Sequence, residues 1–466
     1  MNKRIALSRL SLVGILLVSG CNLAPHYQRP AAPITPQWQE PSTQGAKASS
    51  LAWSQFFTDP RLQQLIRLAL DNNRDLRVAA LNVEGARVQL GITQADLLPS
   101  VSGTATKTAE HLPANLYSTQ SSGPVTYQQY EATASASWEL DFFGKLRNLR
   151  EQSLEEYLSY QATQQATQLS LVAQVVSAYI TLAADNDLHQ VAVETVASQQ
   201  YSYNLVQKRL AAGVANEQDL LQSRTALESA QADIVQYDRD RRQAAYALQL
   251  LLGTTLPPQI AKNASLTSIH VFPALSSELP SSVLTRRPDI LAAEHTLKAA
   301  NANIGVARAA FFPSISLTAT GGSLSSSLSS LLGAGTGGWT FVPTLSLPLF
   351  EGGKNKATLD LAKVTARSDV AAYEKAIQVA FQEVSDALVG KETYQQEVGL
   401  RAADVATNQR YYTLAQRRYQ EGVDGYLDVL TAQRSLYSAQ QTYLTVLSSS
   451  LTQQVTLYKV LGGGWR

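Results

Sequence analysis

The chain has 466 residues, a formal net charge of +1 and a charged fraction of 16%, below the roughly 25% typical of soluble domains. The near-zero charge gives no reason to expect nucleic acid as a partner, and a single cysteine excludes an intramolecular disulfide. The five histidines show no metal-ligand spacing and no Ser/His/Asp constellation is evident, so we expect no enzyme, no metal site and no cofactor.

Residues 1–20 have the pattern of a signal peptide. Basic residues precede an apolar segment, Leu10 to Val18, that is too short to span a bilayer comfortably, and small residues lead to Cys21. This resembles the bacterial lipobox, which implies acylation of Cys21 and a lipidated segment over 21–59; an ordinary signal peptide with a chance cysteine is the alternative. Asn22, in place of aspartate, favours transfer to the outer membrane of a Gram-negative bacterium.

The rest of the chain contains two copies of one unit, which is the first feature to look for in a long sequence. Residues 75–102 align with 289–316 at a constant shift of 214. A second set aligns at a shift of 209, taking Gly213 to Gly422. We therefore expect a first repeat over 60–253, a linker over 254–285, a second repeat over 286–461 and a C-terminal tail over 462–466.

Each repeat is predicted to open with a helix, over 73–97 and 288–311, that stops at a proline. Strands follow, of which the clearest is Tyr130 to Leu140, with apolar and polar residues alternating over eleven positions. The second repeat alternates in the same way over 314–320 and 340–349, although Pro343 and Pro348 weaken its last strand. No run of 18 apolar residues follows Cys21, so further membrane crossing is expected to use strands. A soluble sheet with one solvated face is the alternative.

Very long helices come next. Residues 145–212 contain no glycine or proline, and a helix of that length spans about 100 Å. Gly213 permits a turn before a second helix over 214–252, and the second repeat has the same layout over 354–421 and 426–461, with a turn at Gly422. A solvated coiled-coil rod is one interpretation. The strands between the helices favour a wall of helices that lines water.

Four strands cannot close a barrel alone, and open sheet edges are not tolerated in lipid. Three chains would supply twelve strands by cyclic symmetry. The predicted fold class is therefore an α+β membrane protein with an internal duplication. Long antiparallel helical hairpins would form an α-barrel, and four strands per chain would contribute to a trimeric twelve-stranded transmembrane β-barrel.

Several motifs carry a specific resemblance that covers essentially the whole chain. They are Cys21-Asn22-Leu23-Ala24-Pro25 with Tyr27-Gln28-Arg29-Pro30, Leu140-Asp141-Phe142-Phe143-Gly144, Arg286-Arg287-Pro288-Asp289-Ile290, Ala299 to Pro313, Ala432-Gln433-Arg434-Ser435-Leu436 and Leu461-Gly462-Gly463-Gly464-Trp465. On these the chain resembles the outer-membrane factor (TolC-like) family of tripartite efflux systems, in the lipoprotein branch of OprM and CusC.

The resemblance implies a homotrimer anchored by lipid on Cys21 in the outer membrane and extending into the periplasm. Its partners would be outer-membrane lipid, a periplasmic adaptor (membrane fusion) protein and an inner-membrane pump, often of the proton-driven RND class. The expected function is a passive exit duct for small toxic compounds such as drugs, dyes or copper and silver ions, as in multidrug resistance. A type I protein secretion duct and a tether without a lumen are the alternatives.

A gate is expected at the hairpin tips, because a tube open to the periplasm would leak. Carboxylate rings can narrow such a pore, and the tips carry Glu217 and Asp219 in one repeat and Asp424 and Asp428 in the other. Asp219 and Asp428 are equivalent in the repeat. Acids in first helical turns are also favoured by the helix dipole alone.

The family resemblance adds a constriction of tyrosine, leucine, aspartate and arginine on the second tip. The matching positions are Tyr419, Leu427, Thr431 and Arg434. Thr431 departs from the pattern, because the family has a carboxylate there. We hypothesise that Asp428 substitutes for it.

Overall fold

The computed structural model describes residues 22–35, 51–113, 125–269, 272–273, 275 and 281–463. The predicted signal peptide, Cys21 and the last three residues of the tail lie outside these ranges. The chain divides into two compact units. The strand unit comprises residues up to 30, 83–160 and 293–373, and the helical unit comprises 31–82, 161–292 and 374–466.

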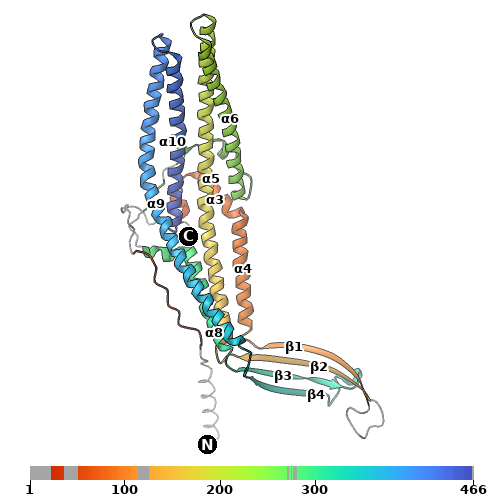
Figure 1. The fold of residues 1–466 in the computed structure, drawn as a ribbon. Helices are drawn as coiled ribbons and strands as arrows, with labels where there is room; N and C mark the ends of the chain where they lie inside the picture. The colour runs from red at the N-terminus through yellow and green to blue at the C-terminus, as the bar shows by residue number, and fades with distance from the viewer. Residues whose placement is uncertain are drawn as a thin grey trace. The chain divides into compact units, whose positions relative to one another are not determined.

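The elements follow the predicted duplication (Figure 1). The first copy contains α3 (Pro60–Asn72), α4 (Arg74–Ala95), β1 (Ser100–Leu112), β2 (Val125–Leu140), α5 (Lys145–Ala211) and α6 (Glu217–Leu252). The second contains α8 (Pro288–Ala309), β3 (Ser314–Ser325), β4 (Gly337–Ser346), α9 (Lys354–Gln420) and α10 (Tyr426–Val460). Two short helices, α2 (Trp53–Phe56) and α7 (Pro258–Lys262), lie outside this pattern.

The long helices end at the positions that the glycines in the sequence indicate. α5, α9 and α10 each end within one residue of the predicted position. α6 begins three residues later than predicted, because the Asn216 side chain accepts a hydrogen bond from the Asp219 amide and caps the helix there. α3 was not predicted from the sequence; its N-cap is Asp59, and Asn73 separates it from α4.

The strand unit holds one antiparallel sheet of order β1-β2-β3-β4. β2 and β3 come from different repeats and pair over eleven positions, from Tyr130 opposite Ser325 to Leu140 opposite Ile315. The central seam of the sheet is therefore the junction between the two copies. β1 and β4 form the two edges, and neither has a second partner strand within the described residues.

The last strand differs from its prediction. β4 ends at Ser346 and does not continue to residue 349. Pro348 lacks the amide hydrogen that a ladder requires, which explains the earlier stop. Pro343 is accommodated within β4, opposite Leu317 of β3, because an edge strand tolerates a missing donor on its free side.

The sheet does not enclose a core of its own. Every side chain of β4 is exposed, and none of the described side chains of β1 is buried. The exposed residues of β4 include large apolar ones, with Trp339 at 80% and Leu345 at 66% exposure. A strand edge with exposed apolar side chains and unpaired backbone groups is expected to be covered by a non-aqueous environment or by another strand.

The core of the helical unit is aromatic and aliphatic. Phe56 stacks on Tyr458 with ring centroids 4.2 Å apart, and Phe57 and Phe272 pack against this pair. The middle of α5, from Leu169 to Ala184, contributes many of the buried apolar side chains, whereas Gln174 and Thr181 in the same stretch are exposed. α5 is the one described helix long and apolar enough by length and composition to cross a membrane, but 56% of its most apolar 18-residue window is buried inside the structure.

Two features, a buried arginine and a glycine with positive φ, fix the ends of helices in this unit. Arg287, just before α8, is buried and donates hydrogen bonds to Asp289, Glu383 and the Val460 carbonyl oxygen. Gly253 ends α6 in the left-handed region at φ 64°, and a Cβ there would lie 2.3 Å from the Asn72 carbonyl oxygen. The Arg-Pro-Asp motif and this glycine are therefore required by packing.

Candidate functional site at the helical hairpin tips

Each long hairpin turns at a glycine with positive φ, +75° at Gly213 and +78° at Gly422. The Gly213 amide donates to the Leu210 carbonyl and the Val214 amide to the Arg209 carbonyl, both at 2.9 Å. The equivalent bonds in the second hairpin run from Gly422 to Tyr419 and from Val423 to Arg418. The two tips thus share one backbone turn, built at glycines because other residues rarely adopt this conformation.

The acidic residues predicted from the sequence lie beside these turns. Glu217 and Asp219 are in the first turn of α6, and Asp428 is in the first turn of α10. Asp219 and Asp428 are each the third residue of their helix, where the positive end of the helix dipole favours a carboxylate.

Asp424 takes part in an ion pair within its own hairpin. Arg418 Nε lies 2.5 Å from Asp424 Oδ2, and Nη2 lies 2.9 Å from Oδ1. The bidentate guanidinium holds the pKa of the Asp424 carboxyl below its usual value. The contact braces the turn across Gly422 and uses an arginine that sequence analysis had not singled out.

The repeat equivalent of Arg418 is Arg209, and it makes a different contact. Its guanidinium carbon lies 4.5 Å from the centroid of the Tyr419 ring in the other hairpin, and its Nη1 lies 3.5 Å from the Tyr419 carbonyl oxygen. The sequence explains the difference. Asp424 corresponds to Ala215 in the first hairpin, which offers Arg209 no carboxylate, and Tyr419 has no aromatic counterpart at Leu210.

Tyr419 itself is buried, at 6% exposure, within a cluster that joins both hairpins. Its ring contacts that of Tyr426 edge-on at 5.7 Å, and burial raises the pKa of Tyr426 to about 12. The remaining buried members of the cluster are Val206, Ala226, Ala415, Val429, Leu430 and Ala432. The tyrosine predicted to form part of the gate therefore lies inside the protein, in the packing between the two hairpins.

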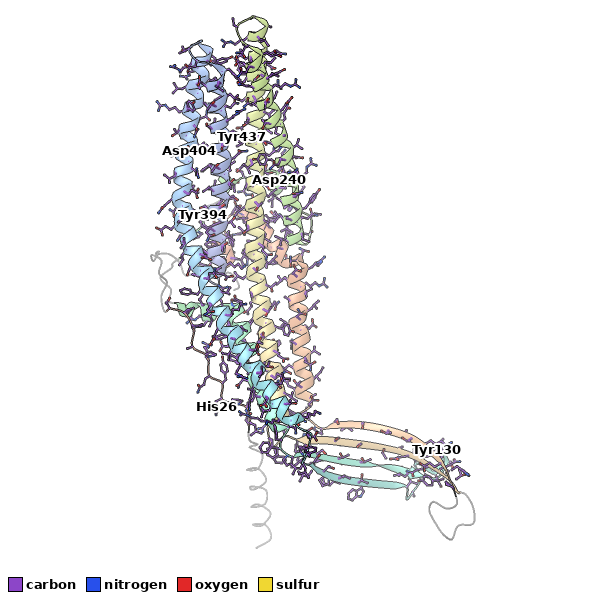
Figure 2. The ribbon with its side chains drawn as sticks, in the orientation of Figure 1. His26, Tyr130, Asp240, Tyr394, Asp404 and Tyr437 are labelled. Carbon is purple, nitrogen blue, oxygen red and sulfur yellow. The ribbon has the colours of Figure 1, made fainter. Side chains whose placement is uncertain are left out.

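Hydrogen bonds continue the seam between the hairpins beyond this cluster. Ser198 on α5 contacts the Tyr412 hydroxyl at 2.8 Å and accepts from Gln433 Nε2 at 3.0 Å. Farther along, Tyr437, labelled in Figure 2, donates to Asp233 at 2.9 Å. The buried oxygens Gln199 Oε1 and Gln433 Oε1 have no hydrogen-bond partner among the described residues. Because some of its buried polar atoms lack hydrogen-bond partners, this seam costs less free energy to separate than a fully apolar contact between the hairpins would.

The other predicted gate residues are on the surface of α10. Leu427, Thr431 and Arg434 recur at helical spacing along one exposed face. The Thr431 hydroxyl donates to the Leu427 carbonyl oxygen at 2.8 Å, so it is engaged by its own helix. Asp428 and Arg434 form no ion pair within the described part of the chain, which leaves both available to a neighbouring molecule.

Sequence analysis missed Arg209 and Arg418. The signal was present, because both lie four residues before a tip glycine and are related by the same shift of 209 residues that aligns the repeats. It could not reveal that the Arg209 side chain reaches the Tyr419 ring of the other hairpin, because that contact depends on how the two hairpins pack.

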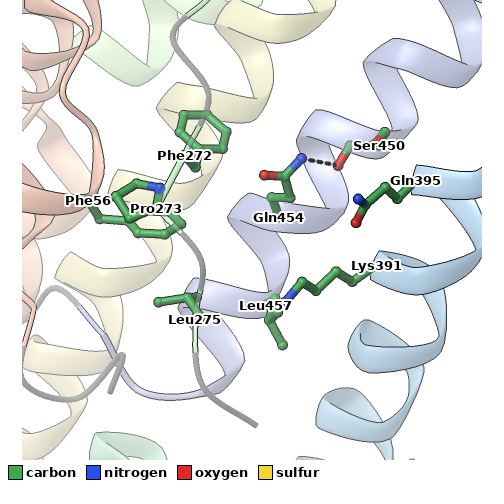
Figure 3. A pocket seen from close by; sticks show the side chains of 9 residues that line it. All are labelled: Phe56, Phe272, Pro273, Leu275, Lys391, Gln395, Ser450, Gln454 and Leu457. Atoms are coloured by element: carbon green, nitrogen blue, oxygen red, sulfur yellow. Dashed lines mark hydrogen bonds between the residues drawn. The ribbon is translucent and has the colours of Figure 1, made fainter. Parts of the chain in front are cut away.

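A cavity of about 300 Å³ lies in the helical unit, between α9, α10 and the residues around Phe272 (Figure 3). Phe56, Leu275 and Leu457 form an apolar side, and Gln395 and Gln454 contribute amide groups. Burial lowers the pKa of Lys391, which also lines it. No group of three or more His, Cys, Asp or Glu side chains suited to a metal ion occurs among the described residues.

Comparison with known proteins adds family evidence. The sequence matches the family described as "Outer membrane efflux protein" over residues 65–254 and again over 279–463. The antibiotic efflux pump outer membrane protein ArpC of Pseudomonas putida is 48% identical over 466 residues, covering 98% of this chain and 96% of that protein. The cation efflux system protein CusC of Escherichia coli is 40% identical over 458 residues, covering 97% of each.

Solved structures agree with these sequence relatives. The open state of the Neisseria gonorrhoeae MtrE outer membrane channel has a TM-score of 0.85 at 36% identity, covering 96% of this chain and 99% of that one. The similarity extends over nearly the full length of both chains, so it includes the strands as well as the long hairpins.

Proposed function

Because the chain belongs to the outer membrane efflux protein family and is an outer-membrane channel of an efflux pump, we propose that three copies form one continuous exit duct. The sheet supports this proposal most directly. It offers four strands with two open edges and an exposed apolar surface. Pairing β4 of one copy with β1 of the next would satisfy both edges, and three copies would close a barrel of twelve strands.

The anchor is the second part of the proposal. The pattern before Cys21 favours an acylated N-terminus anchored in the outer membrane. Because one acyl chain alone gives only reversible membrane binding, we expect several chains, including palmitate, on this residue. Asn22 supports sorting to the outer membrane.

The hairpin tips are the proposed gate and the proposed contact with a periplasmic adaptor. The tie from Arg209 to Tyr419 and the partly satisfied seam around Gln433 link the two hairpins of one chain. An adaptor that favours separated hairpins would open the tips by shifting this equilibrium. The exposed Asp428 and Arg434 are then available to pair between copies in the closed state.

The proposed cargo is small toxic compounds delivered by an inner-membrane pump of the RND class. One relative is named for antibiotics and another for cations. The described residues contain no side-chain cluster that would select a metal ion, so we assign cargo selection to the pump. As cargo we propose drugs in preference to copper or silver ions.

Complementation in a strain that lacks its own outer-membrane channel tests the proposal. The chain is expressed with a drug-type pump and adaptor and, separately, with a copper/silver-type set, and survival is scored on dyes, antibiotics, copper and silver. Rescue by the drug-type set is expected. Rescue only of protein export with a type I secretion set would replace the proposal by the secretion alternative. A protein that inserts but shows no single-channel conductance in planar bilayers would instead be a tether.

A further inference from the structure

Residues 22–30 form an extended segment, here called the N-terminal strap, that lies along α8 within the strand unit. Three residues of α8 hold it. Arg308 Nη1 donates to the Leu23 carbonyl oxygen at 2.8 Å, and Asn301 Nδ2 donates to the Pro25 carbonyl oxygen at 2.8 Å. Glu294 accepts from Arg29 at 3.0 and 2.7 Å and from the Tyr27 hydroxyl at 3.2 Å.

The three holding residues are spaced by seven, which keeps them on one face of the helix. From Leu23 to Arg29, an extended chain covers about 20 Å, and from Arg308 to Glu294 the helix covers about 21 Å. The strap therefore runs antiparallel to α8 with no slack. A slip by one residue would lose the bonds to both carbonyls, so the strap has a single register.

Glu294 is the centre of this docking. Its side chain is only 3% exposed, and Lys298 lies 3.7 Å from it and 5.5 Å from the centroid of the Tyr27 ring. Burial alone would raise the pKa of the Glu294 carboxyl, but Arg29, Lys298 and Tyr27 together hold it below its usual value. The buried charge therefore depends on the strap for most of its partners.

Packing gives an independent sign that α8 accommodates the strap. A Cβ at Gly305 would lie 2.9 Å from the Ala24 Cβ and 2.5 Å from Asn148 Nδ2. Gly91 is the equivalent residue of the first repeat, on α4, and a Cβ there would meet nothing within 4 Å. Of the two equivalent glycines, only the one in the repeat that carries the strap is crowded, first by the Asn148 side chain of α5 and then by Ala24 of the strap.

We propose that the strap docked on α8 is a spacer that fixes where the acylated N-terminus emerges, at the end of α8 next to β3. Leu23 is held by the second-last residue of α8, and β3 begins six residues later at Ser314. Cys21 is two residues before Leu23, so at most about 7 Å of chain separate them. The lipid then enters the bilayer beside the sheet. The role of the anchor rests on the proposed function, whereas the docking does not.

A nitroxide spin label tests the proposal. It is placed at Leu23→Cys in the full chain, reconstituted in phospholipid nanodiscs, where acylation of Cys21 leaves the new thiol as the one that reacts. We expect an immobilised spectrum and a single depth at the bilayer surface, measured from the relative accessibility to oxygen and a nickel chelate. Glu294→Gln removes the charge but keeps the size, and Gly305→Leu fills the space taken by Ala24 and by the Asn148 side chain. Both should release the label and spread its depth.

Gly91→Leu is the matched control, since it places the same side chain at the equivalent position of the other repeat, and its spectrum should equal that of the parent. An immobilised label at unchanged depth in both Glu294→Gln and Gly305→Leu would overturn the proposal. Incorporation of radioactive palmitate is measured in the same samples. Protein without palmitate would refute the lipid anchor. The docking is then read separately from a Cys21→Ser, Leu23→Cys variant, whose one thiol is at position 23, so the two failures are distinguishable.

Discussion

Arg209 of the first hairpin lies over the Tyr419 ring of the second, with its guanidinium carbon 4.5 Å from the ring centroid. Its repeat counterpart, Arg418, instead pairs with Asp424 in its own hairpin. One duplicated residue thus ties two hairpins together in one copy and braces a single turn in the other.

Replacing Arg209 by alanine should loosen the tips. A cation–π contact of this kind contributes about 1 kcal/mol, which corresponds to a roughly fivefold shift toward separated hairpins. Single-channel recordings should show a higher open fraction, and cells should become more sensitive to vancomycin. Lys208→Ala is the control, because it removes a neighbouring exposed cation that makes no ion pair among the described residues. Equal open fractions in the two variants would exclude Arg209 from gating.

Asp428→Ala tests whether this residue replaces the family carboxylate missing at Thr431. If Asp428 pairs between copies in the closed state, the variant should leak large antibiotics, and Thr431→Asp in the same background should restore closure. Antibiotic susceptibility and bilayer conductance are the measurements. Asp219→Ala provides the comparison on the other tip. Unchanged sensitivity in Asp428→Ala would remove this residue from the gate.

Asp185 predicts a pH dependence of stability. Burial and the nearby Asp240 carboxylate raise its pKa from 3.8 to about 6. The folded protein therefore binds more protons than the unfolded chain between these values, and stability is lost as pH rises through about 6. Asp185→Asn should stabilise at pH 7.5 by about 1 kcal/mol after allowance for solvent screening of a half-exposed group. Thermal unfolding at pH 7.5 should reveal the gain, and a gain of equal size at pH 4 would contradict the assignment.

Gly253 and Gly213 separate two costs of replacing a glycine. Both have positive φ, but a Cβ at Gly253 would meet the Asn72 carbonyl oxygen at 2.3 Å, whereas at Gly213 it would meet nothing within 4 Å. Gly213→Ala should therefore cost about 1 kcal/mol from backbone strain, and Gly253→Ala about 3 kcal/mol or more from strain and displacement of α3. Urea unfolding midpoints of the detergent-extracted variants provide the test. Similar midpoints would show that the contact with Asn72 relaxes freely.

Much of the architecture could be predicted because it depends on residues that are close together in the sequence. Glycines and prolines mark the ends of the long helices, and the alternation from Tyr130 to Leu140 identifies a strand. The repeat then requires the second copy to have the same elements. The family and the channel function, which were predicted from the resemblance, are confirmed by the comparisons, which also identify a channel family and not an enzyme family.

Long-range choices could not be predicted in the same way. Nothing near Tyr419 in the sequence indicates that it is buried against Arg209, two hundred residues away. The strap was expected only as a lipidated segment, because its bonds to Arg308 and Asn301 involve backbone carbonyls, which leave no pattern in the residues that carry them. α3 was missed because its helical signal ends at Asn73, where a new helix begins at once.

The seam between β2 and β3 has a consequence for how such a ring could be built. It joins the two repeats through backbone pairing, with one side-chain hydrogen bond between Ser135 and Thr320, in the same antiparallel sense that β4 and the next β1 would need. The covalent linker between the repeats then fixes only how many chains are needed. The strand pairing in the sheet does not require it. A chain carrying one repeat would have to gather as six subunits to enclose the same circumference, and it would lose the freedom to make its two tips different.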